Sequence, residues 1–283
     1  METTALLQQK FAHYGTNAAR IRPIFEEVAG RLCDRLLDTK NTFSLGLDMG
    51  AGLGSVRRNL PPQKQPHLFI EADFCPQVLQ KNTSQHALIM DGEAPFPFAA
   101  KTFDLITTNL MLPWVQNVPK FLAQSGRALA EDGLFLASTL GENSFYELQT
   151  AFSAAGSDTP HTNPMPDVQT VGEALQNVGF ALPVIDRDKL ILEYDNFANL
   201  WADLKALGAT NMHPARCRGL MTPRLFQRVE EQYRFHFATP QGTFPLTLEI
   251  IYLHGWRPHK SQQKPLPRGS GQVDLSQVLA QNK

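Results

Sequence analysis

The segment FSLGLDMGAGLG, residues 43–54, carries the strongest structural signal in this chain. Its apolar run, Leu45 to Met49, contains one acid, Asp48, and leads into glycines at positions 50, 52 and 54. An apolar run, closely spaced glycines and a second apolar segment, Val56 to Leu60, predict a strand, a tight turn and a helix. Glycines allow such a turn to approach a ligand closely and to adopt positive φ angles. We therefore expect a small-molecule site at the carboxyl end of a first β-strand.

The glycines are spaced G-x-G-x-G, which is shorter than the G-x-G-x-x-G of dinucleotide-binding folds. The longer form makes room for a pyrophosphate, so the shorter one favours a ligand without phosphate at this turn. A strand–helix turn that binds nothing could carry the same glycines, and the segments that follow have to distinguish the two cases.

Composition excludes several classes of protein. The chain has 283 residues, which suffices for an α/β core with additional elements. Its net charge of −1 argues against nucleic acid as a partner. Its three cysteines show no CxxC spacing, so we expect a reduced compartment without a disulfide framework or metal site. No apolar run approaches the roughly 20 residues of a transmembrane segment, and the N-terminus resembles no targeting sequence. We expect a cytoplasmic protein.

Strand-like and helix-like segments alternate from residue 43 to 140, which predicts right-handed crossovers and a parallel sheet. The sheet then continues beyond a helix that ends at Gly179. We expect strands over 45–49, 67–72, 87–90, 103–110, 134–139, 182–186, 189–194 and 247–256, and helices over 56–60, 118–129, 167–178, 196–207 and 223–237.

Three regions are expected: a helical arm over 1–40, a main domain over 41–260 and an extended tail over 261–283. Two helices within about 195–240 precede the last strand, where they would form a lid over the carboxyl end of the sheet. In the arm, Tyr14 belongs either to a solvated segment or to a flap that closes over the ligand. The arginines of the lid, either solvated or an anion dock, are Arg216, Arg218, Arg224 and Arg228.

Asp73 ends the second expected strand, and 73 − 50 places it 23 residues after the first glycine. That is close to the ~20 residues at which an acid meets ribose hydroxyls in related α/β folds. A carboxylate that faces a diol accepts two charge-assisted hydrogen bonds. Glu71 is a neighbour that could compete for this role. We favour Asp73 because DFCPQVL continues as a capped helix, and a purely capping role is the alternative.

Polar groups also follow the third and fourth strands. Asp91 and Gly92 could offer a carboxylate and a backbone N–H to an adenine edge, although an ordinary turn acid is the alternative. Asn109, Met111 and Trp114 follow the fourth strand, at the edge where open parallel sheets bind ligands.

Together, LDMGAGLG, Asp73, DGEAPFPF followed by FDLITTNL, and LAEDGLF resemble the class I S-adenosylmethionine (SAM) methyltransferase family. The resemblance implies an α/β, Rossmann-like fold: a seven-stranded, mostly parallel sheet with helices on both faces and an antiparallel last strand. It implies SAM as the cofactor and Tyr14 and Trp114 as catalytic residues of the acceptor pocket. The residues implied in cofactor binding are Asp48, Gly50, Ala51, Gly52, Asp73, Phe74, Asp91, Gly92 and Asn109.

Two subfamilies are more similar still. FAHYGTNA, LGATNMH and GTFPLTLEIIYLHGW resemble the malonyl-carrier-protein O-methyltransferase of biotin synthesis. WADLKALG and the tail GWRPHKSQQKPLPRGSGQVDLSQVL resemble the respiratory complex I assembly factor, a protein-arginine hydroxylase, along nearly the whole chain. These resemblances imply a protein partner, either the iron–sulfur-carrying subunit of complex I or an acyl carrier protein.

The two resemblances imply different chemistry. Methyl transfer requires in-line approach of an oxygen or nitrogen to the sulfonium methyl. Hydroxylation requires an oxidant, usually iron held by two histidines and a carboxylate, and none of the eight histidines begins an HxD or HxE pair. We therefore expect a SAM-dependent methyltransferase that acts on a protein or protein-bound substrate. The alternatives are an arginine hydroxylase that assembles complex I, and a non-catalytic scaffold on the same fold.

Overall fold

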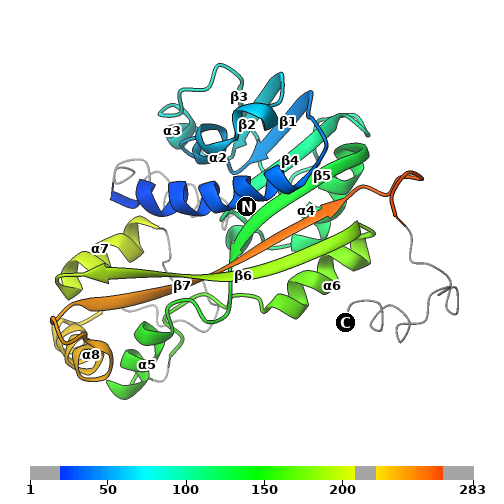
Figure 1. Ribbon diagram of the computed structural model, residues 1–283. Coiled ribbons are helices and arrows are strands. Elements are labelled where there is room, and N and C mark those ends of the chain that lie inside the picture. The colour runs from blue at the N-terminus through cyan, green and yellow to red at the C-terminus, as the bar shows by residue number, and fades with distance from the viewer. Residues whose placement is uncertain (1–19, 158, 208–220, 264–283) are drawn as a thin grey trace, which may run out of the picture.

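The computed structural model describes residues 20–157, 159–207 and 221–263 (Figure 1). Within them, seven strands form one sheet in the order β3-β2-β1-β4-β5-β7-β6. The first five strands are parallel, and β7 runs antiparallel to both β5 and β6. The strands are β1 (Leu45–Met49), β2 (Leu68–Asp73), β3 (Ala87–Ile89), β4 (Phe103–Asn109), β5 (Leu129–Leu140), β6 (Ala181–Tyr194) and β7 (Phe244–Trp256).

A helix over residues 20–34 begins the described chain and is followed by a short 3-10 turn, η1 (Arg35–Asp38). The remaining α-helices are α2 (Ser55–Asn59), α3 (Pro76–Leu79), α4 (Val118–Ala128), α5 (Tyr146–Ala154), α6 (Val168–Val178), α7 (Phe197–Ala206) and α8 (Pro223–Phe237), with 3-10 turns η2 (Pro62–Lys64) and η3 (Leu112–Trp114).

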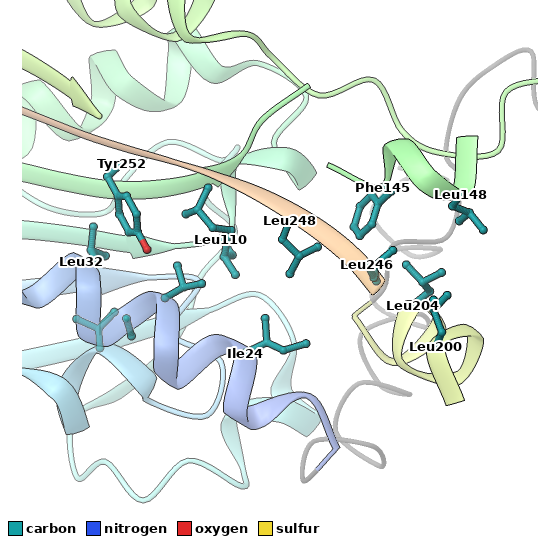
Figure 2. Close-up of a cluster of buried hydrophobic side chains, with 14 of the residues drawn as sticks. Ile24, Leu32, Leu110, Phe145, Leu148, Leu200, Leu204, Leu246, Leu248 and Tyr252 are labelled. Carbon is teal, nitrogen blue, oxygen red and sulfur yellow. The ribbon is translucent and has the colours of Figure 1, made fainter. Parts of the chain in front are cut away.

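The two faces of the sheet carry separate cores. On one face, α4 and α6 bury apolar side chains such as Phe121 and Leu175 against Ile106, Phe135 and Ile251 of the strands. On the other face, the helix over 20–34 covers the middle of the sheet. Figure 2 shows Ile24 and Leu32 of that helix on the side that faces Leu248 and Tyr252 of β7, all four within one buried cluster. The arrangement confirms the expected Rossmann-like, seven-stranded sheet with helices on both faces.

The antiparallel pair of β6 and β7 extends well beyond the parallel strands (Figure 1). Helices α5, α7 and α8 pack around this extension rather than on the first five strands. The ring of Phe197, at the start of α7, lies among the rings of Trp201, Phe226, Tyr233 and Phe244. The two helices inserted before the last strand thus form, with α5, a compact group on the ends of β6 and β7.

Side-chain caps fix several helix ends that the sequence predicts. Asp167 accepts the N–H of Thr170 at the start of α6, and Gly179 ends that helix with φ of 92°. Asn196 caps α7 and Thr222 caps α8 in the same way. These short polar side chains satisfy N–H groups that the first helical turn leaves free, which explains why the predicted and observed limits agree closely.

Two details differ from the expectations. The strands expected over 182–186 and 189–194 are one continuous strand, β6, because the residues between them also pair with β7. Asp186 and Asp188 form ion pairs with Arg35 of η1 and Arg31 of the preceding helix. Helix α5 was not expected: it begins at Tyr146, directly after Phe145, which has a positive φ and, among the described residues, makes no side-chain capping bond. In the described ranges, no helix has both the length and the apolar character that a membrane span requires.

Candidate cofactor site

The glycine turn after β1 has the conformation that its sequence predicts. Gly50, Gly52 and Gly54 have φ angles of 71°, 55° and 80°, which a side chain would strain. The N–H groups of Gly50 and Ala51 both donate to the carbonyl of Ala72, at 2.8 and 3.0 Å. This pair of hydrogen bonds holds the turn against the end of β2.

Asp73, the last residue of β2, is almost fully buried beside that turn. Its Oδ2 accepts the N–H of Gly52 at 3.0 Å, and its Oδ1 accepts the N–H of Cys75 at 2.8 Å. Burial raises the pKa of the carboxyl group, while these backbone hydrogen bonds oppose the rise. The first position before α3 is Cys75, and no side chain caps that helix. Asp73 is therefore not the N-cap of α3. Its two oxygens instead connect the glycine turn after β1 to the turn after β2.

Glu71, the other acid of β2, has a different environment. Its carboxylate is fully buried and accepts hydrogen bonds from Arg57 Nε at 2.8 Å and from Asn82 Nδ2 at 3.2 Å. Glu71 does not line the pocket described below, whereas Asp73 does. Residues two apart on a strand share a face, so the two acids differ because of their partners: Arg57 holds Glu71, whereas Asp73 faces the pocket.

Asp48 is fully buried within β1, two residues before the turn. Its Oδ1 accepts the hydroxyl of Thr107 at 2.8 Å, while its Oδ2 has no hydrogen-bond partner among the described residues. Burial raises the pKa of this carboxyl group well above its usual range, and the charge of Glu71 adds to the effect. Asp48 lies behind the turn rather than on the surface of the pocket.

A pocket opens at the carboxyl ends of β1, β2 and β4. Seven of the residues that the sequence predicts for the site line it: Gly50, Ala51, Gly52, Asp73, Phe74, Asn109 and Trp114. Asp48, Asp91 and Gly92 do not line it, and Tyr14 lies outside the described residues.

The fourth strand supplies the far wall of the pocket. Asn109 is fixed on both sides, because its Nδ2 donates to the carbonyl of Phe25 at 3.1 Å and its Oδ1 accepts the hydroxyl of Ser138 at 2.7 Å. The first of these bonds attaches the helix over 20–34 to the end of β4. Leu110 follows with a φ of 57°, a strained conformation for a side chain that also lines the pocket.

Sequence reasoning missed several lining residues. Phe25 comes from a helix far from the glycine turn in sequence, and its apolar spacing predicts only a core position. The others are the aliphatic Val56, Val78 and Leu110 and the hydroxyl of Ser55. Met111, which the sequence places at the ligand-binding edge of the sheet, also lines the pocket. Ser55 and Val56 follow the glycines directly in the sequence, and this proximity could have predicted that they line the pocket.

A second, apolar pocket adjoins the first. The two share Phe25, Leu110 and Trp114, so these three side chains stand between them. The remaining lining residues are Ile24, Leu140, Phe145, Met165, Leu207 and Leu248. In the described part of the chain, no three or more His, Cys, Asp or Glu side chains are grouped to hold a metal ion.

Comparison with known families identifies this architecture. The model of a methyltransferase domain matches residues 19–183, which is more than half of the chain. The chain therefore belongs to the methyltransferase family, and it is an enzyme whose cofactor is SAM.

Individual relatives fall into the two groups that the sequence resembles. Arginine-hydroxylase NDUFAF5, mitochondrial, of Danio rerio is 31% identical over 264 residues, which cover 89% of this chain and 82% of that protein. Malonyl-[acyl-carrier protein] O-methyltransferase of Halorhodospira halophila is 31% identical over 256 residues, which cover 88% of this chain and 86% of that protein. Because both identities are 31%, identity alone does not separate the two groups.

Solved structures support the fold. A putative methyltransferase from Bacillus halodurans superimposes with a TM-score of 0.57 at 15% identity, covering 82% of this chain and 99% of that one. The YcgJ protein from Bacillus subtilis gives 0.55 at 16% identity, covering 81% of this chain and 98% of that one. At such identities the likeness concerns the fold alone.

The residues of the pocket fit the family's cofactor. The glycine turn after β1 presents only backbone atoms to one wall of the pocket, and the buried carboxylate of Asp73 lies beside it. Apolar and aromatic groups, including Phe74 and Val78, supply the rest of the lining. A nucleoside with hydroxyl groups and a planar base needs this combination of acceptor and apolar surface.

Proposed function

We propose that this enzyme transfers a methyl group from SAM to an acceptor carried on a protein. The observation that supports this most directly is the pair of adjoining pockets at the carboxyl end of the sheet. One is lined by the glycine turn and an acid, and the other is almost entirely apolar. Phe25, Leu110 and Trp114 separate them, so a cofactor in the first pocket and an acceptor in the second would meet at this wall.

The residues of the chain would divide the work. Gly50, Ala51, Gly52, Asp73, Phe74 and Asn109 would hold SAM, and when bound SAM supplies an electrophilic methyl group on a sulfonium. Asp73 would accept hydrogen bonds from ribose hydroxyls, because each of its oxygens has a lone pair beyond the one already used. Trp114 and Phe25 would exclude water and orient the acceptor. Holding the acceptor atom in line with the methyl group accelerates the transfer.

The likeness to malonyl-[acyl-carrier protein] O-methyltransferase supports a carrier-bound acceptor. A carboxylate acceptor needs no general base, since it already has the lone pair that attacks the methyl group. This agrees with an acceptor pocket whose described lining contains no titratable side chain.

The second candidate is hydroxylation of a protein arginine, and the likeness to the arginine-hydroxylase over most of both chains favours it. Intact-mass analysis separates the candidates. Malonyl-acyl carrier protein and the iron–sulfur-carrying subunit of complex I would be compared after production with and without this enzyme. A methyl increment supports the first candidate and a single added oxygen supports the second. No change in either protein while SAM still binds would favour the non-catalytic scaffold.

A further inference from the structure

The cofactor pocket ends at a methionine. Met111 lies two residues after β4, is partly buried and lines the pocket. A Cβ placed on Gly50 would lie 2.6 Å from Met111 Sδ and 2.7 Å from its Cγ. A Cβ placed on Gly92 would lie 3.2 Å from Met111 Cε. The side chain therefore spans the gap between the glycine turn after β1 and the turn that follows β3.

This position separates the pocket from Asp91 and Gly92, the two residues that the sequence predicts at an adenine edge. Neither of them lines the pocket, although the pocket reaches Met111. Oδ1 of Asp91 accepts the N–H of Glu93 at 2.9 Å, which leaves lone pairs for a further donor. Met111 is a lining residue of the pocket that also approaches Gly92, the neighbour of Asp91.

The backbone around Met111 is fixed, whereas its side chain can rotate. The N–H of Leu110 lies 3.0 Å from Ser138 Oγ and 3.1 Å from the carbonyl of Ser138. The carbonyl of Met111 accepts the N–H of Trp114 at 2.9 Å. Methionine is unbranched and has three rotatable bonds, which makes it the apolar side chain best suited to adopt a second position.

We propose that Met111 is a gate within the cofactor pocket. In the free enzyme its thioether fills the adenine end of the site, and binding of an adenosyl ligand turns it aside and joins the pocket to Asp91 and Gly92. The inference rests on the proposed function, because it takes an adenosyl compound as the occupant. The competing arrangement is a fixed wall, with the base resting against Met111 and never reaching Asp91.

The two arrangements predict opposite effects of shortening the side chain. S-adenosylhomocysteine serves as the probe, and its Kd is measured by titration calorimetry on the full chain. With a gate, Met111→Ala tightens binding about tenfold, equivalent to about 1.4 kcal/mol, because the ligand no longer displaces a packed thioether. Met111→Phe weakens binding at least as much. Met221→Ala, a partly buried methionine outside the pocket, leaves the Kd unchanged.

A second measurement tests the path beyond the gate. Asp91→Asn weakens binding in both the wild-type and the Met111→Ala background if the base reaches Asp91. Unchanged or weaker binding by Met111→Ala, or an Asp91→Asn variant that binds like the wild type, would overturn the gate. If neither the wild type nor Met111→Ala binds the probe, the cofactor assignment itself fails. Binding by the wild type without tightening by Met111→Ala refutes the gate alone.

Discussion

The carboxylate of Asp73 accepts the backbone N–H of Gly52 at 3.0 Å, which fixes the end of β2 against the glycine turn after β1. A similar arrangement occurs at the opposite end of β1, where Oδ2 of Asp104 accepts the N–H groups of Ser44 and Leu45 at 2.9 and 3.1 Å. Each acid therefore holds two backbone N–H groups, but only Asp73 lines the pocket. The pair allows the binding role of a carboxylate to be separated from its structural role.

Replacing Asp73 by alanine removes an acceptor from the proposed ribose site. We expect Asp73→Ala to weaken binding of S-adenosylhomocysteine by about 1–3 kcal/mol, the scale for loss of a hydrogen-bond partner that holds a charge. Titration calorimetry measures this change. Asp104→Ala, which also removes an acceptor of two backbone N–H groups, should lower the unfolding midpoint about as much as Asp73→Ala does and leave the Kd unchanged. Equal affinities for the wild type and Asp73→Ala would remove Asp73 from the site.

The ion pair of Arg57 and Glu71 gives the second prediction. Glu71 is fully buried, and Arg57 is its charged partner at 2.8 Å. We expect Arg57→Met to destabilise the fold by about 3–5 kcal/mol, because it leaves a buried carboxylate without a compensating charge. The double variant Arg57→Met with Glu71→Gln should recover part of that loss, since the remaining side chain is neutral. Urea unfolding followed by circular dichroism measures both.

The single variant Glu71→Gln tests whether Glu71 has only a structural role. If Glu71→Gln weakens S-adenosylhomocysteine binding more than Asp73→Ala does, then Glu71 is the binding acid of β2 and Asp73 the structural one.

Much of the parallel half of the molecule was predictable, because its signals are local. The run from Leu45 to Met49 matches β1 residue for residue, and the glycines that follow have the positive φ angles expected of them. Asp167 and Gly179 fix both ends of α6 through contacts within a few residues. Asp73 was predicted at the pocket for a similar reason, because it ends the strand that pairs with β1.

The remaining features depend on contacts between distant segments. Two short strands were expected where the structure has β6, whose Asp186 and Asp188 pair with Arg35 and Arg31, 151 and 157 residues earlier. Phe25 lines the pocket, and its carbonyl accepts the side-chain N–H of Asn109, 84 residues later. No local pattern reports either contact. The same limit applies to Asp91, whose access to the pocket depends on the side chain of Met111.

The aromatic group around Phe197 gives the third prediction. Phe197 is buried on all sides by rings from α7, α8 and β7. We expect Phe197→Ala to cost about 3–5 kcal/mol of unfolding free energy, whereas Phe197→Leu retains most of the packing. Hydrogen exchange should show the loss concentrated in α5, α7 and α8, because these helices pack on the extension of β6 and β7. Uniform loss of protection throughout β1 and β4 would contradict this division.

The fourth prediction concerns the pH dependence of stability. Asp48 is fully buried, one of its oxygens has no hydrogen-bond partner in the described part of the chain, and burial raises the pKa of its carboxyl group well above the usual value. Between the unfolded pKa of about 3.9 and the raised folded pKa, the folded enzyme keeps a proton that the unfolded chain has lost. This contribution to stability therefore falls as the pH rises through that window. An asparagine in the same place has no proton to lose, so Asp48→Asn abolishes the loss.

We expect the free energy of unfolding of Asp48→Asn to rise relative to the wild type as the pH increases from about 4 toward the raised folded pKa. Near pH 4, close to the unfolded pKa, little of this stability has yet been lost, so the two proteins should differ least. Urea unfolding at several pH values, without cofactor, measures the difference. Thr107→Val provides the matched control, because it removes the only hydroxyl that donates to Asp48 among the described residues. Loss of that donor raises the pKa of the carboxyl group further and extends the falling limb to higher pH. Parallel stability profiles for the wild type and Asp48→Asn would show that Asp48 is ionised in the folded enzyme despite its burial.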